Sequence, residues 1–202
     1  VLGFDHLVVA LGNVPALGDL PGGREHALPF KSLGDALQVR NHVLNVLEEA
    51  AVETDPEVRR GLMSFVVAGG GFSGVELAAE LNDFVHEVVR DYRGLDAAEL
   101  RVVLLHSGDR ILPELDESLG RFAHRLLTRR GMEIRLGTRL EVATATAARM
   151  STGDRLETRT IVSTVPSGPN PLLQTLPVEL HRGRVPVDAH LAVPGLDRVW
   201  AV

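Results

Sequence analysis

Three glycines lie at the spacing typical of a turn that binds the phosphates of a dinucleotide. Gly69, Gly71 and Gly74 form a G-x-G-x-x-G pattern. The first glycine permits a tight turn, the second leaves room for a pyrophosphate, and the third lets a helix pack close to a strand. The free amides of that helix would face the phosphates. The candidate cofactor-binding residues of the turn are Gly69, Gly70, Gly71, Phe72, Ser73 and Gly74.

The segments on both sides of the glycines strengthen this prediction. Residues 65–68 form a short apolar, β-prone run before the turn. Without a strand and a helix around it, a G-x-G-x-x-G pattern is a weak indication, because glycine-rich turns recur in ordinary connections. Strand, turn and helix together predict a dinucleotide-binding site. The apolar residues that repeat at helical spacing after the turn are Val75, Ala78, Leu81, Val85, Val88 and Val89.

The position that would contact the adenosine ribose has an unusual residue. A second strand is predicted over 102–105, and an acidic residue at its end would accept hydrogen bonds from the ribose 2′-hydroxyl. His106 occupies this position, followed by Ser107. A neutral imidazole also bonds a hydroxyl, but it does not repel a 2′-phosphate, and Arg110 is close enough in sequence to attract one. Alternatively, His106 and Ser107 only cap the strand and Arg110 lies in solvent.

Two further candidates flank the predicted nucleotide site. Glu76 lies in the first turn of the helix after the glycines, where the helix dipole favours a carboxylate whether or not it touches a ligand. Pro166 lies in the segment 163–170, STVPSGPN, which either forms a rigid loop that approaches the cofactor or is a plain turn. No catalytic residue is assigned.

The wider pattern predicts a Rossmann-like, doubly wound parallel α/β sheet with a small antiparallel β flap. An amphipathic helix is expected over 33–52 with Ser32 as its N-cap, broken by Asp55-Pro56 and Gly61. After the second strand, residues 115–130 have helical spacing, with Leu119, Phe122, Ala123, Leu126 and Leu127 as the apolar positions. Gly131 suits the C′ position of this helix.

The rest of the chain is expected to complete the sheet. Residues 132–136 form its next strand, 140–160 the flap and 160–165 a returning strand. Residues 4–12 and 198–202 also read as strands.

Composition excludes several classes of protein. With 202 residues, 45% of them hydrophobic, a folded core in one or two domains is expected. The net charge of −6 and the scattered basic residues argue against nucleic-acid binding. No long apolar run or signal-peptide pattern is found, which favours a cytoplasmic location. Because cysteine is absent, redox chemistry must be carried by a cofactor. The eight histidines have no metal-ligand spacing, so no metal site is expected.

The chain resembles type II NADH dehydrogenases, which are FAD-dependent members of the pyridine nucleotide-disulfide oxidoreductase superfamily. The resemblance covers essentially the whole chain. Its matching segments are, in chain order, HLVVALGNVP, PFKSLGDALQVRNHVL, VVAGGGFSGVELAAEL, VVLLHSGDRILPEL, STVPSGPNPLL and GRVPVDAHLAVPGLDRVWAV.

The resemblance implies an NAD(P)H-binding domain over 62–165, inserted between two remnants of a flavin-binding domain, 1–61 and 166–202. It implies that the parent protein passes hydride from NADH to FAD and electrons to quinone, and that Glu76 faces the nicotinamide ribose. It favours NADH over NADPH, because related chains associated with NADH also have histidine at the ribose position. The flavin-binding glycine fingerprint of the family is not found in these residues, so the fragment alone is expected to bind nucleotide without turnover.

Other functions remain open at this point. An NAD(P)H-dependent ferredoxin-type reductase and a non-catalytic nucleotide-sensing module are both compatible with the sequence. The parent is expected to be peripheral on the cytoplasmic face of the membrane, in contact with it only through parts outside this chain. Copies of this fragment are expected to associate, with a homodimer as one assembly, because loss of the flavin-binding domain would expose apolar edges around 7–11 and 199–202.

Overall fold

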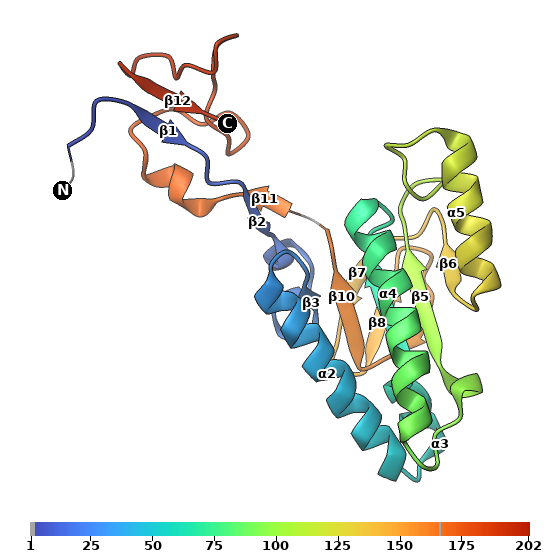
Figure 1. Cartoon of the computed structure of the whole chain (residues 1–202). Coiled ribbons are helices and arrows are strands. Elements are labelled where there is room, and N and C mark those ends of the chain that lie inside the picture. Colours follow the sequence, from blue (N-terminus) through green and yellow to red (C-terminus); the bar gives the residue numbers. More distant parts are fainter. Residues whose placement is uncertain (1–2, 166) are drawn as a thin grey trace. The chain divides into compact units, whose positions relative to one another are not determined.

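The computed structural model describes residues 3–165 and 167–202, and the chain divides into two compact units. The larger unit runs from Pro15 to Pro166, and the smaller unit combines Val1–Val14 with Ser167–Val202. Figure 1 labels the elements of both units.

A parallel sheet of five strands forms the centre of the larger unit. Its strand order is β3 (Leu28–Pro29), β10 (Thr160–Ser163), β4 (Ser64–Ala68), β5 (Arg101–Leu105) and β6 (Glu133–Arg135). Every neighbouring pair is parallel. Parallel strands buried on both faces require nearly continuous apolar sequences, which β4 and β5 have. The predicted Rossmann-like α/β sheet is therefore confirmed.

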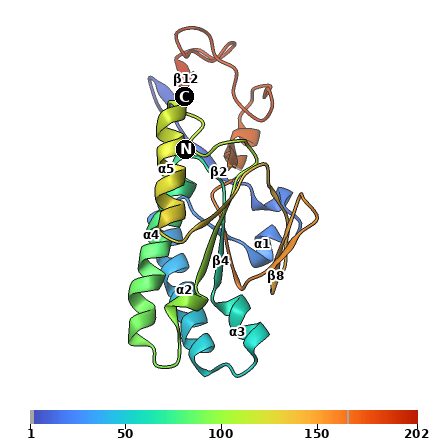
Figure 2. The same cartoon turned by 90° about the vertical axis from the view of Figure 1, so that its right-hand side faces the viewer.

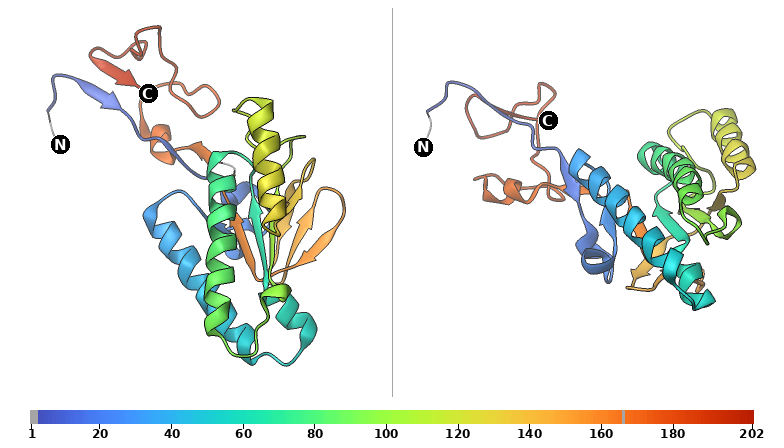
Figure 3. Two further views of the ribbon diagram at one scale, coloured as in Figure 1. Left: turned by 45° about the vertical axis from the view of Figure 1, so that its right-hand side comes forward. Right: turned by 60° about the horizontal axis from the view of Figure 1, so that its bottom comes forward.

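Helices cover one face of this sheet. They are α2 (Leu33–Val52), α4 (Phe72–Val88) and α5 (Glu117–Arg129), whereas α3 (Pro56–Leu62) lies at the end of the sheet where β4 begins (Figure 2). Helix α4 lies between α2 and α5 in Figures 1 and 3. Short 3-10 helices at Val89–Asp91 and Ala97–Glu99 lead from α4 to β5. The side chains buried between the helices and the sheet include Val43, Leu47, Leu62, Phe65, Val67, Ala78, Val85 and Leu104.

An antiparallel flap covers the opposite face. Strands β7 (Leu140–Ala143), β8 (Ala147–Met150) and β9 (Arg155–Glu157) form it, together with the 3-10 helix η1 (Leu17–Asp19) and α1 (Gly23–His26). Figure 2 shows β8 and α1 on one side of β4 and the large helices on the other. The apolar side chains that join the flap to the sheet include Val66, Val103, Leu105, Ala148, Met150, Leu156 and Ile161. The predicted flap is confirmed.

Helix α2 begins as the sequence predicts. Ser32 and Asp35 form a capping box, in which Ser32 Oγ accepts a hydrogen bond from the Asp35 amide at 3.2 Å and Asp35 Oδ2 accepts one from the Ser32 amide at 2.7 Å. Leu33 and Leu37 are exposed, however, because burial of the apolar face starts only at Val39.

The segment after α2 differs from the prediction. Asp55-Pro56 and Gly61 were expected only to break the helix over 33–52, which does end at Val52, but Pro56 and Gly61 belong to a second helix, α3, and Asp55 is its N-cap. Asp55 Oδ1 accepts a hydrogen bond from the Glu57 amide at 2.8 Å and caps this helix. Pro56 occupies the first helical turn, where its fixed φ suits a helix and its missing N–H costs nothing. Gly61 lies inside α3 and is buried.

Helix α5 lies where its spacing predicts, but most of its apolar residues stay in contact with solvent. Leu127 is buried and Ala123 is partly buried, whereas Leu119, Phe122 and Leu126 are exposed. Gly131 ends the helix with φ +86°, as expected of a C′ glycine.

The smaller unit contains the terminal strands. Strand β1 (Leu7–Val9) pairs in parallel with β12 (Val199–Ala201), and β2 (Asn13–Pro15) pairs with β11 (Ser167–Pro169). A 3-10 helix at Pro171–Thr175 follows β11. The two predicted terminal strands are confirmed, although each is shorter than its predicted range. Their buried core consists of Val9, Val193, Val199 and Ala201.

The compact units do not coincide with the predicted domains, whose bounds 1–61, 62–165 and 166–202 stay a prediction. The larger unit begins at Pro15 rather than Leu62, because β3 pairs with β10 and α2 buries Val43 and Leu47 in the main core. That residues 1–61 and 166–202 are parts of a flavin-binding domain stays a prediction.

Candidate functional site: a cavity at the glycine turn

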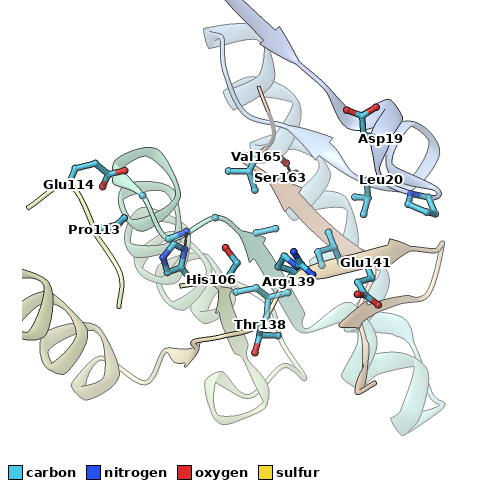
Figure 4. Close-up of a pocket in the computed structure, with 18 residues that line it drawn as sticks. Asp19, Leu20, His106, Pro113, Glu114, Thr138, Arg139, Glu141, Ser163 and Val165 are labelled. Carbon is cyan, nitrogen blue, oxygen red and sulfur yellow. Dashed lines mark hydrogen bonds between the residues drawn. The ribbon is translucent and has the colours of Figure 1, made fainter. Parts of the chain in front are cut away.

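A cavity of about 530 Å³ lies at the carboxyl ends of the central strands. The last residues of β4, β5 and β10, which are Ala68, Leu105 and Ser163, all contribute to its lining. Ligands of open parallel α/β sheets bind at this edge. All 18 lining residues belong to the larger unit, and Figure 4 shows them around the cavity.

Two glycines of the motif are required by the protein's own packing. Gly69 has φ +123°, and a Cβ on it would lie 2.2 Å from Thr164 Oγ1. A Cβ on Gly74 would lie 1.7 Å from the Gly69 carbonyl oxygen, so α4 could not approach the turn so closely. These are the tight turn and the close helix packing that the spacing predicts.

Gly71 has no such internal constraint. Its φ of −79° is available to any residue, and the nearest atom to an added Cβ is Glu114 Oε1 at 3.3 Å, at the end of a flexible side chain. Gly71 also lines the cavity. A side chain at this position would therefore affect an occupant of the cavity more than it would affect the fold.

Some backbone amides of the turn donate hydrogen bonds within the protein, and others remain free beside the cavity. The Gly69 amide donates to the Leu105 carbonyl at 2.9 Å, and the Gly70 amide donates to His106 Nδ1 at 3.2 Å. Within the described parts of the chain, the amides of Gly71, Phe72 and Ser73 have no hydrogen-bond acceptor. Free amides at a helix N-terminus suit an anionic ligand such as a phosphate.

His106 supports the glycine turn as well as lining the cavity. Because its Nδ1 accepts the Gly70 hydrogen bond, the neutral ring carries its proton on Nε2. A Cβ on Gly70 would lie 2.6 Å from His106 Cγ, so the ring packs directly on the turn. Nε2–H is the one polar hydrogen that this ring retains for another partner.

The other predicted residues are only partly brought together. Ser107 lines the cavity, but Arg110 does not. The Arg110 guanidinium donates to the carbonyls of Leu115 at 3.1 Å and Pro113 at 2.9 Å, so it holds its own loop together. Its contact with a 2′-phosphate stays a prediction. Glu76 is exposed on α4 and outside the lining.

Phe72 and Ser73 are also exposed on α4 and outside the lining. Pro166 lies outside the described residues, although Val165 beside it lines the cavity.

Several lining residues were not among the predicted site residues. Thr138 and Arg139 follow strand β6, and the rule that ligands bind beyond the carboxyl ends of parallel strands could have suggested them. Glu141 belongs to β7 of the flap. Asp19 and Glu114 carry no such signal, since they come from a short 3-10 helix and from the loop between β5 and α5.

The described residues hold no group of three His, Cys, Asp or Glu side chains that could bind a metal ion. In the same residues, no helix is long and apolar enough to cross a bilayer.

A parallel sheet with a glycine turn at the start of α4 and a cavity beside it is typical of dinucleotide-binding α/β proteins. The family model described as pyridine nucleotide-disulphide oxidoreductase matches residues 1–202, and the chain belongs to this family.

The chain is similar to larger relatives. It is 33% identical to the mitochondrial external alternative NAD(P)H-ubiquinone oxidoreductase B4 of Arabidopsis thaliana, over 98% of this chain and 36% of the relative. It is 32% identical to the type II NADH:quinone oxidoreductase Ndh of Mycobacterium tuberculosis, over 98% of this chain and 45% of the relative. The chain thus spans less than half the length of these relatives.

The same fold occurs in a solved structure. The structure of NDH2 from Plasmodium falciparum in complex with NADH superposes with a TM-score of 0.89 at 22% identity, over 100% of this chain and 43% of that one.

Proposed function

We propose that this chain is the nicotinamide-nucleotide-binding portion of an FAD-dependent NADH:quinone oxidoreductase. One observation carries the proposal: the free amides of Gly71, Phe72 and Ser73 stand at the start of α4 beside a large cavity. The names of the relatives, which are NADH or NAD(P)H oxidoreductases that act on a quinone, support the same activity.

The residues of this chain would bind and orient the nucleotide. The pyrophosphate would accept hydrogen bonds from the free amides at the start of α4, where the helix dipole also favours negative charge. The adenosine ribose would lie toward His106 and Ser107, at the end of β5, because this position contacts that ribose in dinucleotide-binding sheets. The nicotinamide would then extend toward Val165, at the end of β10.

FAD, bound by the whole protein, would accept hydride from NADH and pass two electrons to quinone. The described residues fit the nicotinamide nucleotide rather than FAD, since they contain one strand-glycine-helix turn and no second one for flavin phosphates. Binding and orientation of NADH are therefore the steps assigned to this chain.

Calorimetric titration with NADH tests the proposal, using the Gly71→Val variant. The added side chain should obstruct the pyrophosphate and weaken NADH binding by about tenfold or more. A tenfold loss of affinity is roughly the effect of losing one hydrogen bond to a charged group. Gly3→Val is the control, because a Cβ on Gly3 has nothing within 4 Å. Undiminished NADH binding by a folded Gly71→Val variant would contradict the proposal.

For the whole protein we propose quinone as the electron acceptor and peripheral contact with the cytoplasmic face of a membrane, and for this chain we propose a homodimer as one assembly. The relatives' names support the quinone. Quinone-dependent oxidation of NADH by the full-length protein, with and without added membranes, tests the first two points. Light scattering tests the third.

A further inference from the structure

A carboxylate reaches the glycine turn from a loop that the predicted site does not include. Glu114 lies between β5 and α5, and its Oε1 is 3.3 Å from the position that a Cβ on Gly71 would take. The side chain is exposed and lines the cavity. In Figure 4, Glu114 lies beyond His106 on the side of the cavity away from Arg139 and Glu141.

The loop that carries Glu114 is held in a fixed conformation. Leu112 has φ +51°, which is uncommon for a residue with a side chain and persists only where its surroundings impose it. Its amide donates to the Gly70 carbonyl at 2.7 Å, so the loop is bonded directly to the glycine turn. The Arg110 guanidinium closes the loop through the carbonyls of Pro113 and Leu115. Glu114 is therefore presented to the cavity by the fold.

Glu114 supplies a carboxylate to a site that lacks one at the usual ribose-binding position. The residue after β5 that would carry a ribose-binding carboxylate is His106, and its Nδ1 is already used by the Gly70 amide. A carboxylate beside the turn can accept hydrogen bonds from ribose hydroxyls, and it repels a 2′-phosphate of charge about −2.

The charged side chains of the cavity lining carry a net negative charge. They are three carboxylates, Asp19, Glu114 and Glu141, and one guanidinium, Arg139.

We propose that Glu114 is the residue that selects NADH over NADPH. The inference rests on the proposed nucleotide binding and adds the substrate preference of that site. Glu114 acts as a specificity residue that faces the bound nucleotide, and removal of its charge removes the repulsion of a 2′-phosphate.

The test is the ratio of NADH to NADPH affinity, measured by calorimetry on the 202-residue chain and its Glu114→Gln variant. The unmodified chain should prefer NADH, and the variant should shift the ratio toward NADPH by about tenfold. The reason is that the negative charge of Glu114 lowers the affinity for the nucleotide with the additional phosphate, and the variant lacks that charge. Glu117→Gln is the matched control. It removes the same charge three residues away, at the start of α5, where Glu117 pairs with Arg121 outside the cavity lining.

Each outcome has a distinct meaning. A shifted ratio in Glu114→Gln with an unchanged ratio in Glu117→Gln supports the inference. The inference is overturned if the unmodified chain binds NADH but Glu114→Gln keeps its preference, or if both variants shift the ratio equally. Binding of neither nucleotide by the unmodified chain would refute the proposed function itself.

Discussion

Gly71 and Gly74 belong to one motif but meet different physical demands. A Cβ on Gly74 would lie 1.7 Å from a backbone oxygen, which cannot be relieved by rotating a side chain. We therefore expect Gly74→Ala to lower the free energy of unfolding by about 1–3 kcal/mol through overpacking. Urea unfolding followed by circular dichroism measures this change.

The matched control at this scale is Gly71→Ala. Its backbone conformation is ordinary and its new methyl group meets only the flexible end of Glu114. Its free energy of unfolding should stay within about 0.5 kcal/mol of the unmodified chain. Equal destabilisation by both variants would contradict the view that packing requires glycine at position 74 but not at position 71.

At the scale of elements, α2 joins the sheet through the partly buried His42. His42 Nε2 lies 3.1 Å from the Arg159 carbonyl oxygen and 3.0 Å from Thr160 Oγ1 at the start of β10. Burial lowers the pKa of His42, and the hydrogen bond to Arg159 opposes this shift only in part. The folded chain therefore favours the neutral ring, and its stability should fall as the pH drops below about 6.5, the unfolded-state pKa, toward the lower folded-state value.

Urea unfolding at pH 7.5 and pH 5 checks this expectation. The loss of stability on acidification should be smaller in His42→Gln than in the unmodified chain, because the variant has no ring to protonate on unfolding. His26→Gln is the control, since His26 is exposed in the same unit. An identical pH dependence in all three proteins would count against a role for His42.

At the scale of the whole molecule, the proposed site depends on one unit. Every lining residue of the cavity lies between Asp19 and Val165, within the larger unit. A shortened chain of residues 15–165 should therefore fold and bind NADH with an affinity within about threefold of the full chain, a difference below 1 kcal/mol. Calorimetry on both chains, with circular dichroism as the check of folding, measures this.

Residues 15–165 also contain the complete parallel sheet and the flap. If the shortened chain folds but does not bind NADH, residues of the smaller unit must contribute to the site.

The sequence by itself determined the elements whose signals are local. The apolar run of β4, the glycines after it and the helical repeat of α4 sit next to one another in the chain, so their periodicity and spacing could be recognised without the fold. The capping box of α2 is local in the same sense. Helix α3 was missed because Asp55-Pro56 both ends one helix and starts another, and composition does not separate the two.

Only the tertiary structure decided which polar side chains share the cavity. Arg110 forms hydrogen bonds within its own loop, whereas Glu114, only four positions later, lies beside the glycine turn. The difference arises from the positive φ of Leu112 and its bond to Gly70, a contact across more than 40 residues of chain. Periodicity reports which face of an element is buried, but the direction of a loop side chain depends on such distant contacts.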